Sequence, residues 1–424
     1  MDKRLLHTPE GVRDIYDEEC RKKLAVENKI RHLFHTYGYH DIQTPTFEFF
    51  DIFNKERGSV ASKNLYKFFD REGNTLVLRP DMTPSIARAA SKFYMDELMP
   101  IRFCYNGNTF INHSELQGKL KEITQLGTEL LGDDSVEADA EMIALAVNAL
   151  LEAGVKEFQV EIGEVDFFKG IVEETGMSSE VEAELHHLIE IKNYFGIEEL
   201  LAASALDPEL KEVFLSLPGL FGSVEILDKA KCLTSNEKAL NAIERLEELY
   251  GFLAKQGLEK YISFDLGMVS MYHYYTGIIF RAYTYGTGDA VATGGRYDKL
   301  LAQFGKDSPA VGFGLNLDQL MIAMSRQKLP VLTNHNEIFV IYERSCYDRA
   351  LEFAQFLRKK GIFVQMNVHN TAYSTNDYLL YAKRVNADEL YYFGPASVDG
   401  IIEVAEFMSE TWTRNELSVL KGAF

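Results

Sequence analysis

Three short segments of the sequence combine residue types that can hold a small polar molecule. The first, 77–83, ends a strand-like run with Arg-Pro and then places Asp81 and Thr83 ahead of a helical pattern. A carboxylate in that position can hold an ammonium group through a charged hydrogen bond. Asp and Thr are also good helix N-caps, and the sequence alone favours the two interpretations about equally.

The second segment, 125–129, has the alternation of a strand. Gln125, Gly127 and Glu129 are two residues apart, so they lie on one face of that strand. Two polar side chains beside a glycine indicate the floor of a ligand site. The alternative is an ordinary sheet with one solvated face.

The third segment, 272–280, is an aromatic run in which Tyr274 and Tyr275 lead into apolar residues, and it predicts a strand. A buried tyrosine hydroxyl needs a hydrogen-bond partner, which indicates a polar pocket nearby. The alternative is ordinary cross-strand aromatic packing. Further along, Gly-Gly-Arg-Tyr-Asp at 294–298 predicts a tight turn with a charged pair.

Other patterns predict neither a metal nor a cofactor. His32 and His35 could share a metal ion on a helix, but a solvated helix face is the far more frequent reason for this spacing. The four cysteines form no C-x-x-C pair, which argues against a zinc ribbon or a disulfide framework. The glycines at 286–288 and 294–295 lack the strand-to-helix turn of a dinucleotide site, and a hairpin turn is the better interpretation.

Composition excludes several classes of protein. The chain has 424 residues, of which 46% are hydrophobic, as in ordinary globular proteins. Its formal net charge of −20 argues against a general nucleic-acid or anionic-membrane coat. The sequence has no apolar run of membrane-spanning length and no secretory signal at its start. We therefore expect a cytoplasmic protein that does not enter the membrane.

Hydrophobic periodicity predicts two domains. Residues 1–326 combine strands and helices with a nearly all-helical insertion at about 166–255. A polar linker at 327–336 leads to residues 337–424, where strands and helices alternate as in a small α/β domain. The last element of that domain is predicted as a helix at 413–421.

Together these segments resemble class II histidyl-tRNA synthetases over most of the chain. The resemblance implies an α+β fold, with a six- or seven-stranded antiparallel sheet, flanking helices, the helical insertion and a C-terminal anticodon-binding-like α/β domain. It also implies a homodimer formed through the motif 1 region. Motif 1 of the family is similar to residues 37–48, and motif 2 is similar to 110–125. The segment that holds the histidine amino group is similar to 79–83, and the histidine-specific region to 274–275 with 294–298. Motif 3 begins at 310–314.

The phosphate-binding side of the synthetase pattern is missing. Motif 2 of the family has an arginine for the α-phosphate of ATP where this chain has Ile111, and an acid where it has His113. Motif 3 ends in Glu-Arg in the family and in Asp318-Gln319 here, and the histidine-specific arginine is Ser270. One lost transition-state donor costs about 10²–10³ in rate, so we expect no adenylation and no catalytic residues.

Compensation would have to come from Arg102, Lys119 or Lys121. A lysine replaces the planar fork of an arginine poorly.

The amino-acid side of the synthetase pocket is largely kept, with Asp81 replacing a glutamate. This contrast indicates a histidine sensor. The C-terminal residues 331–424 have nine Lys or Arg against twelve Asp or Glu, a net charge of −3, where an RNA-reading domain should be basic. The residues at histidine-contacting positions are Asp81, Thr83, Gln125, Glu129, Tyr274 and Tyr275.

A second resemblance is to the family of ATP phosphoribosyltransferase regulatory subunits. It rests on Thr-Pro-Glu-Gly-Val-Arg-Asp at 8–14, on Asp-Met rather than Glu-Gly within 78–83, and on Thr124 where synthetases have His. It implies a non-catalytic subunit that binds the short-form catalytic subunit in a hetero-octamer and responds to L-histidine. Many members lack the C-terminal domain, which leaves its role open.

Two alternative functions are also consistent with the sequence. An active histidyl-tRNA synthetase would show histidine-dependent ATP–pyrophosphate exchange. A free-standing histidine-binding module would act on some other partner.

Overall fold

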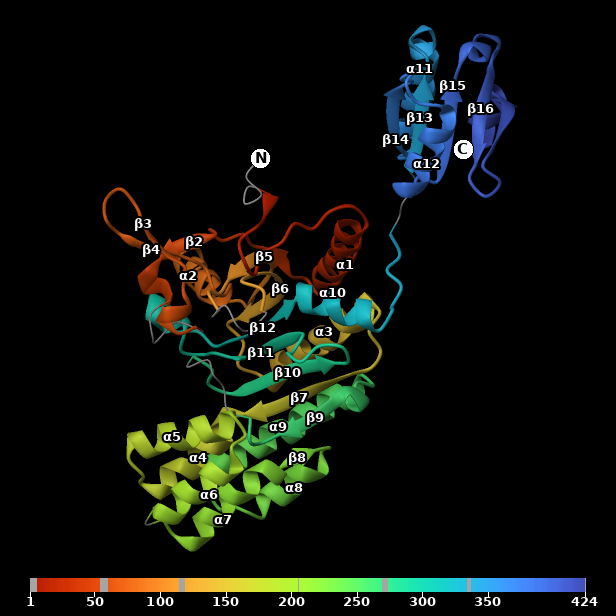
Figure 1. Cartoon of the computed structure of the whole chain (residues 1–424). Coiled ribbons are helices and arrows are strands. Elements are labelled where there is room, and N and C mark those ends of the chain that lie inside the picture. The colour runs from red at the N-terminus through yellow and green to blue at the C-terminus, as the bar shows by residue number, and fades with distance from the viewer. Residues whose placement is uncertain are drawn as a thin grey trace. The chain divides into compact units, whose positions relative to one another are not determined.

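The computed structural model describes residues 6–53, 60–113, 119–204, 206–268, 274–333 and 337–423 (Figure 1). The chain divides into two compact units, Met1–Val331 (unit 1) and Leu332–Phe424 (unit 2). Among the described helices, none is both long and apolar enough to cross a membrane.

Unit 1 is built on a nine-stranded mixed sheet. Its six central strands, in the order β5-β6-β12-β11-β10-β7, are antiparallel throughout, which confirms the predicted core. The bounds in sheet order are β1 (His40–Asp41), β5 (Ile101–Phe110), β6 (Glu122–Leu131), β12 (Ala310–Asn316), β11 (Ala292–Arg296), β10 (Ile278–Thr284), β7 (Phe158–Glu164), β9 (Ile262–Asp265) and β8 (Phe221–Gly222).

Beyond the six antiparallel strands, the nine-stranded sheet also contains two parallel pairs, which the prediction of a six- or seven-stranded antiparallel sheet did not include. β1 pairs with β5 in parallel, and β9 pairs with β7 in parallel. Parallel neighbours need a long crossover connection, and the segment between β7 and β9 provides one because it contains the helical insertion.

Helices cover one face of this sheet. α1 (Asp17–Thr36), α3 (Val136–Ala153) and α10 (Leu317–Arg326) contact its strands, and α3 is buried over most of its length. Alternate residues of β6 divide between the faces: Leu126 and Leu130 belong to the core with α3, whereas Leu131 belongs to a second core with α2 (Thr83–Phe93).

The insertion begins directly after β7. Figure 1 shows its helices as a separate layer beside the β7 edge of the sheet. Apart from β8, the regular elements from Val165 to Lys255 are α-helices and one short 3-10 turn. The helices are α4 (Val165–Thr175), α5 (Ser179–Glu190), α6 (Tyr194–Ala203), α7 (Pro208–Ser216), α8 (Glu225–Lys231) and α9 (Glu237–Lys255).

A small second sheet of unit 1 is formed by segments of residues 47–78. Its order is β2-β4-β3, and both pairs are antiparallel. Phe47, Phe49 and Phe68 share one face by their register with Leu76 and Leu78. All three aromatic side chains are exposed. The strands are β2 (Phe47–Phe49), β3 (Lys67–Phe69) and β4 (Thr75–Leu78).

Unit 2 is an α/β domain with strand order β14-β13-β15-β16-β17. The helix predicted at 413–421 is wrong in its first half, because Thr411–Glu416 forms β17 against β16 and α13 begins only at Leu417. β-Branched and aromatic residues at 411–413 favour the strand. The other elements are β13 (Glu337–Tyr342), α11 (Tyr347–Lys359), β14 (Phe363–Val368), α12 (Thr375–Arg384), β15 (Glu389–Phe393) and β16 (Ile401–Glu406).

A buried carboxylate ties three elements of unit 1 together. Asp139 of α3 is fully buried and accepts a hydrogen bond from Arg296 of β11 (Nε to Oδ1, 2.9 Å) and one from Arg245 of α9 (Nε to Oδ2, 2.9 Å). Each arginine uses a different oxygen of the same carboxylate. The insertion is thereby anchored to the sheet through α3.

We expect Asp139→Ala to destabilise unit 1 by roughly 3–5 kcal/mol, because it leaves buried guanidinium charge uncompensated. The exposed Glu137→Gln on the same helix should cost less than about 1 kcal/mol. Urea unfolding followed by circular dichroism measures both. Tryptophan fluorescence reports the unfolding of unit 2 separately, since Trp412 in that unit is the chain's single tryptophan. Equal stability of the two variants would contradict this role for Asp139.

Candidate functional site

The structure gathers the six residues expected at a histidine site on the sheet face opposite α3. Asp81, Thr83, Gln125, Tyr274 and Tyr275 line one pocket. Glu129 lies at its base, since Thr83 Oγ1 donates to Glu129 Oε1 at 2.7 Å. The other lining residues are Thr293, Tyr297, Gly312, Phe313 and Gly314.

Glycines make the room for these side chains. Gly312 is the register partner of Glu129, and Gly314 is the partner of Gly127, two pairs away from Gln125. A Cβ atom on Gly312 would lie 1.7 Å from Glu129 Oε2, and one on Gly314 would lie 1.9 Å from Gln125 Nε2. Any other residue at these two positions would therefore push the polar side chains out of place.

Glu129 is the most buried acid of the pocket. It is 1% exposed and accepts hydrogen bonds from Thr83 and from the Tyr297 hydroxyl. Burial raises the pKa of this carboxyl to about 8, against the two hydrogen bonds, which lower it. The group is therefore mostly neutral at pH 7, and a nearby cation would favour its ionised form.

Asp81 combines the two roles between which the sequence could not decide. Its Oδ1 accepts from the backbone N–H of Met82 at 2.7 Å and of Thr83 at 3.4 Å, at the start of α2. Its Oδ2 accepts from the Tyr274 hydroxyl at 3.0 Å. One oxygen thus helps to begin the helix while the other faces the pocket.

The expectation of a strand at the two tyrosines needs correction. Tyr274 and Tyr275 lie before β10 rather than within a strand, because pairing with β7 begins only at Ile278. Ser270 lies outside the described residues. Sequence reasoning also missed Tyr297 as a pocket residue, although it stands in the Gly-Gly-Arg-Tyr-Asp turn that marked the region.

The pocket is closed by its own side chains. The free space within it is about 20 Å³, enough for about one water molecule. The Tyr274–Asp81 and Tyr297–Glu129 hydrogen bonds span it. A ligand as large as an amino acid can enter only if these side chains turn away and exchange their hydrogen bonds for bonds to the ligand.

The positions that bind phosphate in synthetases make internal contacts here. Asp318 is 5% exposed and accepts from Lys23 Nζ at 2.7 Å and from the Thr124 backbone N–H at 2.6 Å. Gln319 Oε1 accepts from Thr287 Oγ1 at 2.9 Å. These groups stabilise the junction of β6, α1 and α10.

Two of the three residues that could compensate are already paired with acids, and the stem of the third packs against the chain. Arg102 pairs with Glu141 through two hydrogen bonds of 3.2 Å. Lys119 lies 3.3 Å from Asp289. The aliphatic stem of Lys121 packs against Gly11, where a Cβ atom would lie 2.6 Å from Lys121 Cγ.

One group of possible metal ligands was not expected from the sequence. Ligand atoms of His35, Asp41 and Cys104 lie within 4.8 Å of one another. Both Asp41 oxygens already accept from Arg31 at 2.8 Å. Burial raises the pKa of the Cys104 thiol to about 12, which keeps it protonated and a poor ligand. We assign no metal to this group.

The chain resembles known proteins both in sequence and in fold. The family model described as "Histidyl-tRNA synthetase" matches residues 11–320. The ATP phosphoribosyltransferase regulatory subunit of Acetivibrio thermocellus is 41% identical over 370 residues, 87% of this chain and 88% of the relative. That of Ruminiclostridium cellulolyticum is 42% identical over 365 residues, 86% and 87% of the two chains.

A solved structure from Bacillus halodurans, described as an ATP phosphoribosyltransferase regulatory subunit/histidyl-tRNA synthetase, superposes with a TM-score of 0.82. It is 31% identical and covers 92% of this chain and 98% of its own. The histidyl-tRNA synthetase of Nostoc, with a TM-score of 0.80 at 20% identity over 98% of both chains, shares the fold. This chain therefore belongs to the histidyl-tRNA synthetase-like family of ATP phosphoribosyltransferase regulatory subunits.

Proposed function

We propose that this chain is a non-catalytic subunit that binds the short catalytic ATP phosphoribosyltransferase, supports its activity and carries feedback inhibition by L-histidine. The proposal rests on a contrast between two groups of positions on the same sheet. The six residues at histidine-contacting positions meet in one pocket. The positions for phosphate are taken by internal hydrogen bonds or by an apolar residue.

The pocket offers the groups that a histidine zwitterion needs. Asp81 and Glu129 can accept from the ammonium group or the imidazole. The side chain of Gln125 makes no hydrogen bond to the described residues, so its amide is available to the ligand. Thr83 and the two tyrosine hydroxyls add neutral hydrogen bonds. Binding requires the pocket to open, which is the conformational difference that an allosteric effector must favour.

Assembly is the second part of the proposal. The complex is a hetero-octamer of four regulatory and four catalytic chains, in which the regulatory chains dimerise through the motif 1 region. The exposed face of Phe47, Phe49 and Phe68 lies at the end of that region and would be covered in such a dimer. A cytoplasmic location agrees with the four free cysteines. Nucleic acid is not proposed as a partner.

An active synthetase and a free-standing histidine-binding module are the alternatives. The description of the Bacillus halodurans structure names both a regulatory subunit and a synthetase. Histidine-dependent ATP–pyrophosphate exchange by this chain alone would establish synthetase chemistry.

We expect the short catalytic subunit from the same source to condense ATP with phosphoribosyl pyrophosphate only when this chain is present. Histidine should then lower the rate. The measurement is product formation with and without each component, together with the mass of the complex. Catalysis indifferent to both this chain and histidine would overturn the proposal.

Asp81→Asn should weaken histidine binding by about 1.5–3 kcal/mol, because it removes the charge from one hydrogen bond while an amide oxygen can still accept from Met82 N–H. Titration calorimetry of the chain measures the affinity. Asp70→Asn, at an aspartate that does not line the pocket, is the matched control and should bind histidine as the unaltered chain does. An unchanged affinity in Asp81→Asn would remove this residue from the pocket.

The chain alone should sediment as a dimer of its 48.2 kDa protomer, and Phe49→Asp should shift it toward the monomer. The physical reason is the cost of burying a carboxylate in an apolar interface. Phe363→Asp, at an equally exposed phenylalanine of unit 2, is the control. Sedimentation velocity that shows the same mass for all three proteins would place the interface elsewhere.

A further inference from the structure

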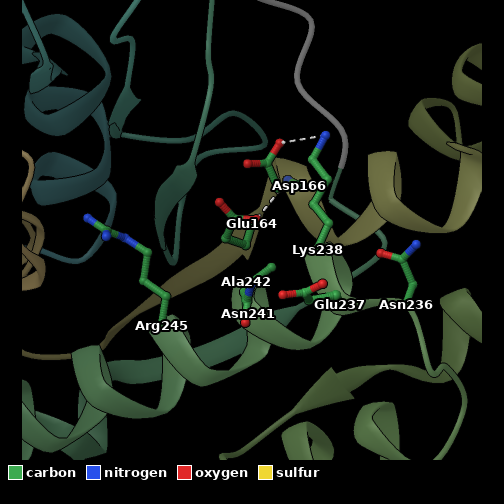
Figure 2. A pocket seen from close by; sticks show the side chains of 8 residues that line it. All are labelled: Glu164, Asp166, Asn236, Glu237, Lys238, Asn241, Ala242 and Arg245. Carbon is green, nitrogen blue, oxygen red and sulfur yellow. Dashed lines mark hydrogen bonds and ion pairs between the residues drawn. The ribbon is translucent and has the colours of Figure 1, made fainter.

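A cleft of about 610 Å³ lies between the end of β7, the start of α4 and one side of α9 (Figure 2). It shares no lining residue with the histidine pocket. Its lining is almost entirely polar or charged: Glu164, Asp166, Asn236, Glu237, Lys238, Asn241, Ala242 and Arg245.

Glu164 is the deepest acid of the cleft and is only half satisfied. The residue is 3% exposed. Its Oε2 accepts from the backbone N–H of Asp166 at 2.7 Å and of Phe167 at 3.2 Å, which caps α4. Its Oε1 has no hydrogen-bond partner among the described residues, and it is not one of the fully enclosed side-chain oxygens that lack a partner, so it is open to the cleft.

The positive charges around the cleft are already engaged. Figure 2 shows Lys238 reaching from α9 toward Asp166, with Glu164 between that pair and Arg245. Lys238 Nζ lies 3.6 Å from Asp166 and 2.7 Å from Glu173. Arg245 is paired with Asp139. Neither lining cation donates to Glu164 Oε1 among the described residues, and the lining amides of Asn236 and Asn241 carry no charge.

We propose that this cleft binds a small organic cation whose N–H group, a primary ammonium or a guanidinium, donates to Glu164 Oε1. A bare metal ion fits less well, since Glu164 is not in the group of converging metal-ligand atoms found among the described residues. The volume admits a molecule of several heavy atoms. The site does not depend on the proposed regulatory function.

The electrostatics of Glu164 agree with this assignment. Burial and the neighbouring Asp166 raise the pKa of the carboxyl to about 7, while the two backbone hydrogen bonds and Arg245 lower it. An acid near its pKa at neutral pH ionises with little cost when a cation binds beside it. A permanently neutral group at this position could not respond in that way.

The test is a ligand-observed NMR titration of the full chain with butylammonium, methylguanidinium and tetramethylammonium at constant ionic strength. We expect saturable binding of at least one of the first two. Tetramethylammonium, which has no N–H donor, should bind at least about tenfold more weakly. Preference for butylammonium would assign the site to primary amines, and preference for methylguanidinium to guanidinium groups.

Glu164→Gln should lose at least about tenfold in affinity, because the amide keeps the shape but not the charge. Glu161→Gln changes an acid on the same strand outside the cleft and should bind like the unaltered chain. Asn241→Trp, at an exposed lining position, should block the cleft and prevent binding. This variant replaces Glu164→Gln in the test if Glu164→Gln does not fold. Binding of neither N–H cation, or equal binding by Glu164→Gln, would overturn the proposal.

Discussion

The close approach of β6 and β12 is the constraint on which the pocket depends. At 312 and 314 the backbone of β12 has no side chain, and the space is filled by Glu129 and Gln125 from β6. The same two strands belong to the antiparallel core of the sheet. The pocket floor is therefore as rigid as the sheet itself, and any adjustment to a ligand must come from the side chains above it.

Those side chains lie on separate parts of the chain. Asp81 and Thr83 start α2, Tyr274 precedes β10, and Tyr297 follows β11. Hydrogen bonds between them close the space that a ligand needs. The empty pocket is thus held shut by the polar groups that would bind a ligand, so binding exchanges one set of hydrogen bonds for another rather than filling a preformed hole.

Local periodicity predicted much of the fold. The alternation at 125–129 predicted a strand, and these residues lie within β6. The helical period predicted the insertion, whose regular elements from Val165 to Lys255 are helices apart from β8. Periodicity could not show which neighbouring strands run parallel, because that depends on where a crossover connection returns the chain to the sheet. It also missed β12, because Gly312 and Gly314 interrupt its apolar residues and glycine is unusual in a strand interior. The six pocket residues were found through motifs, whereas the half-satisfied Glu164 stood in no motif and became visible only through its neighbours.

The contact of Lys23 with Asp318 also bears on how this chain diverged from synthetases. In the place of a phosphate-binding acid-arginine pair stands an aspartate that fastens α1 to β6. An arginine at position 319 would have to displace the hydrogen bond between Gln319 and Thr287, beside an Asp318 that is held by Lys23 and Thr124. A substitution at this junction therefore acts on the packing between α1, β6 and α10 as well as on any ligand.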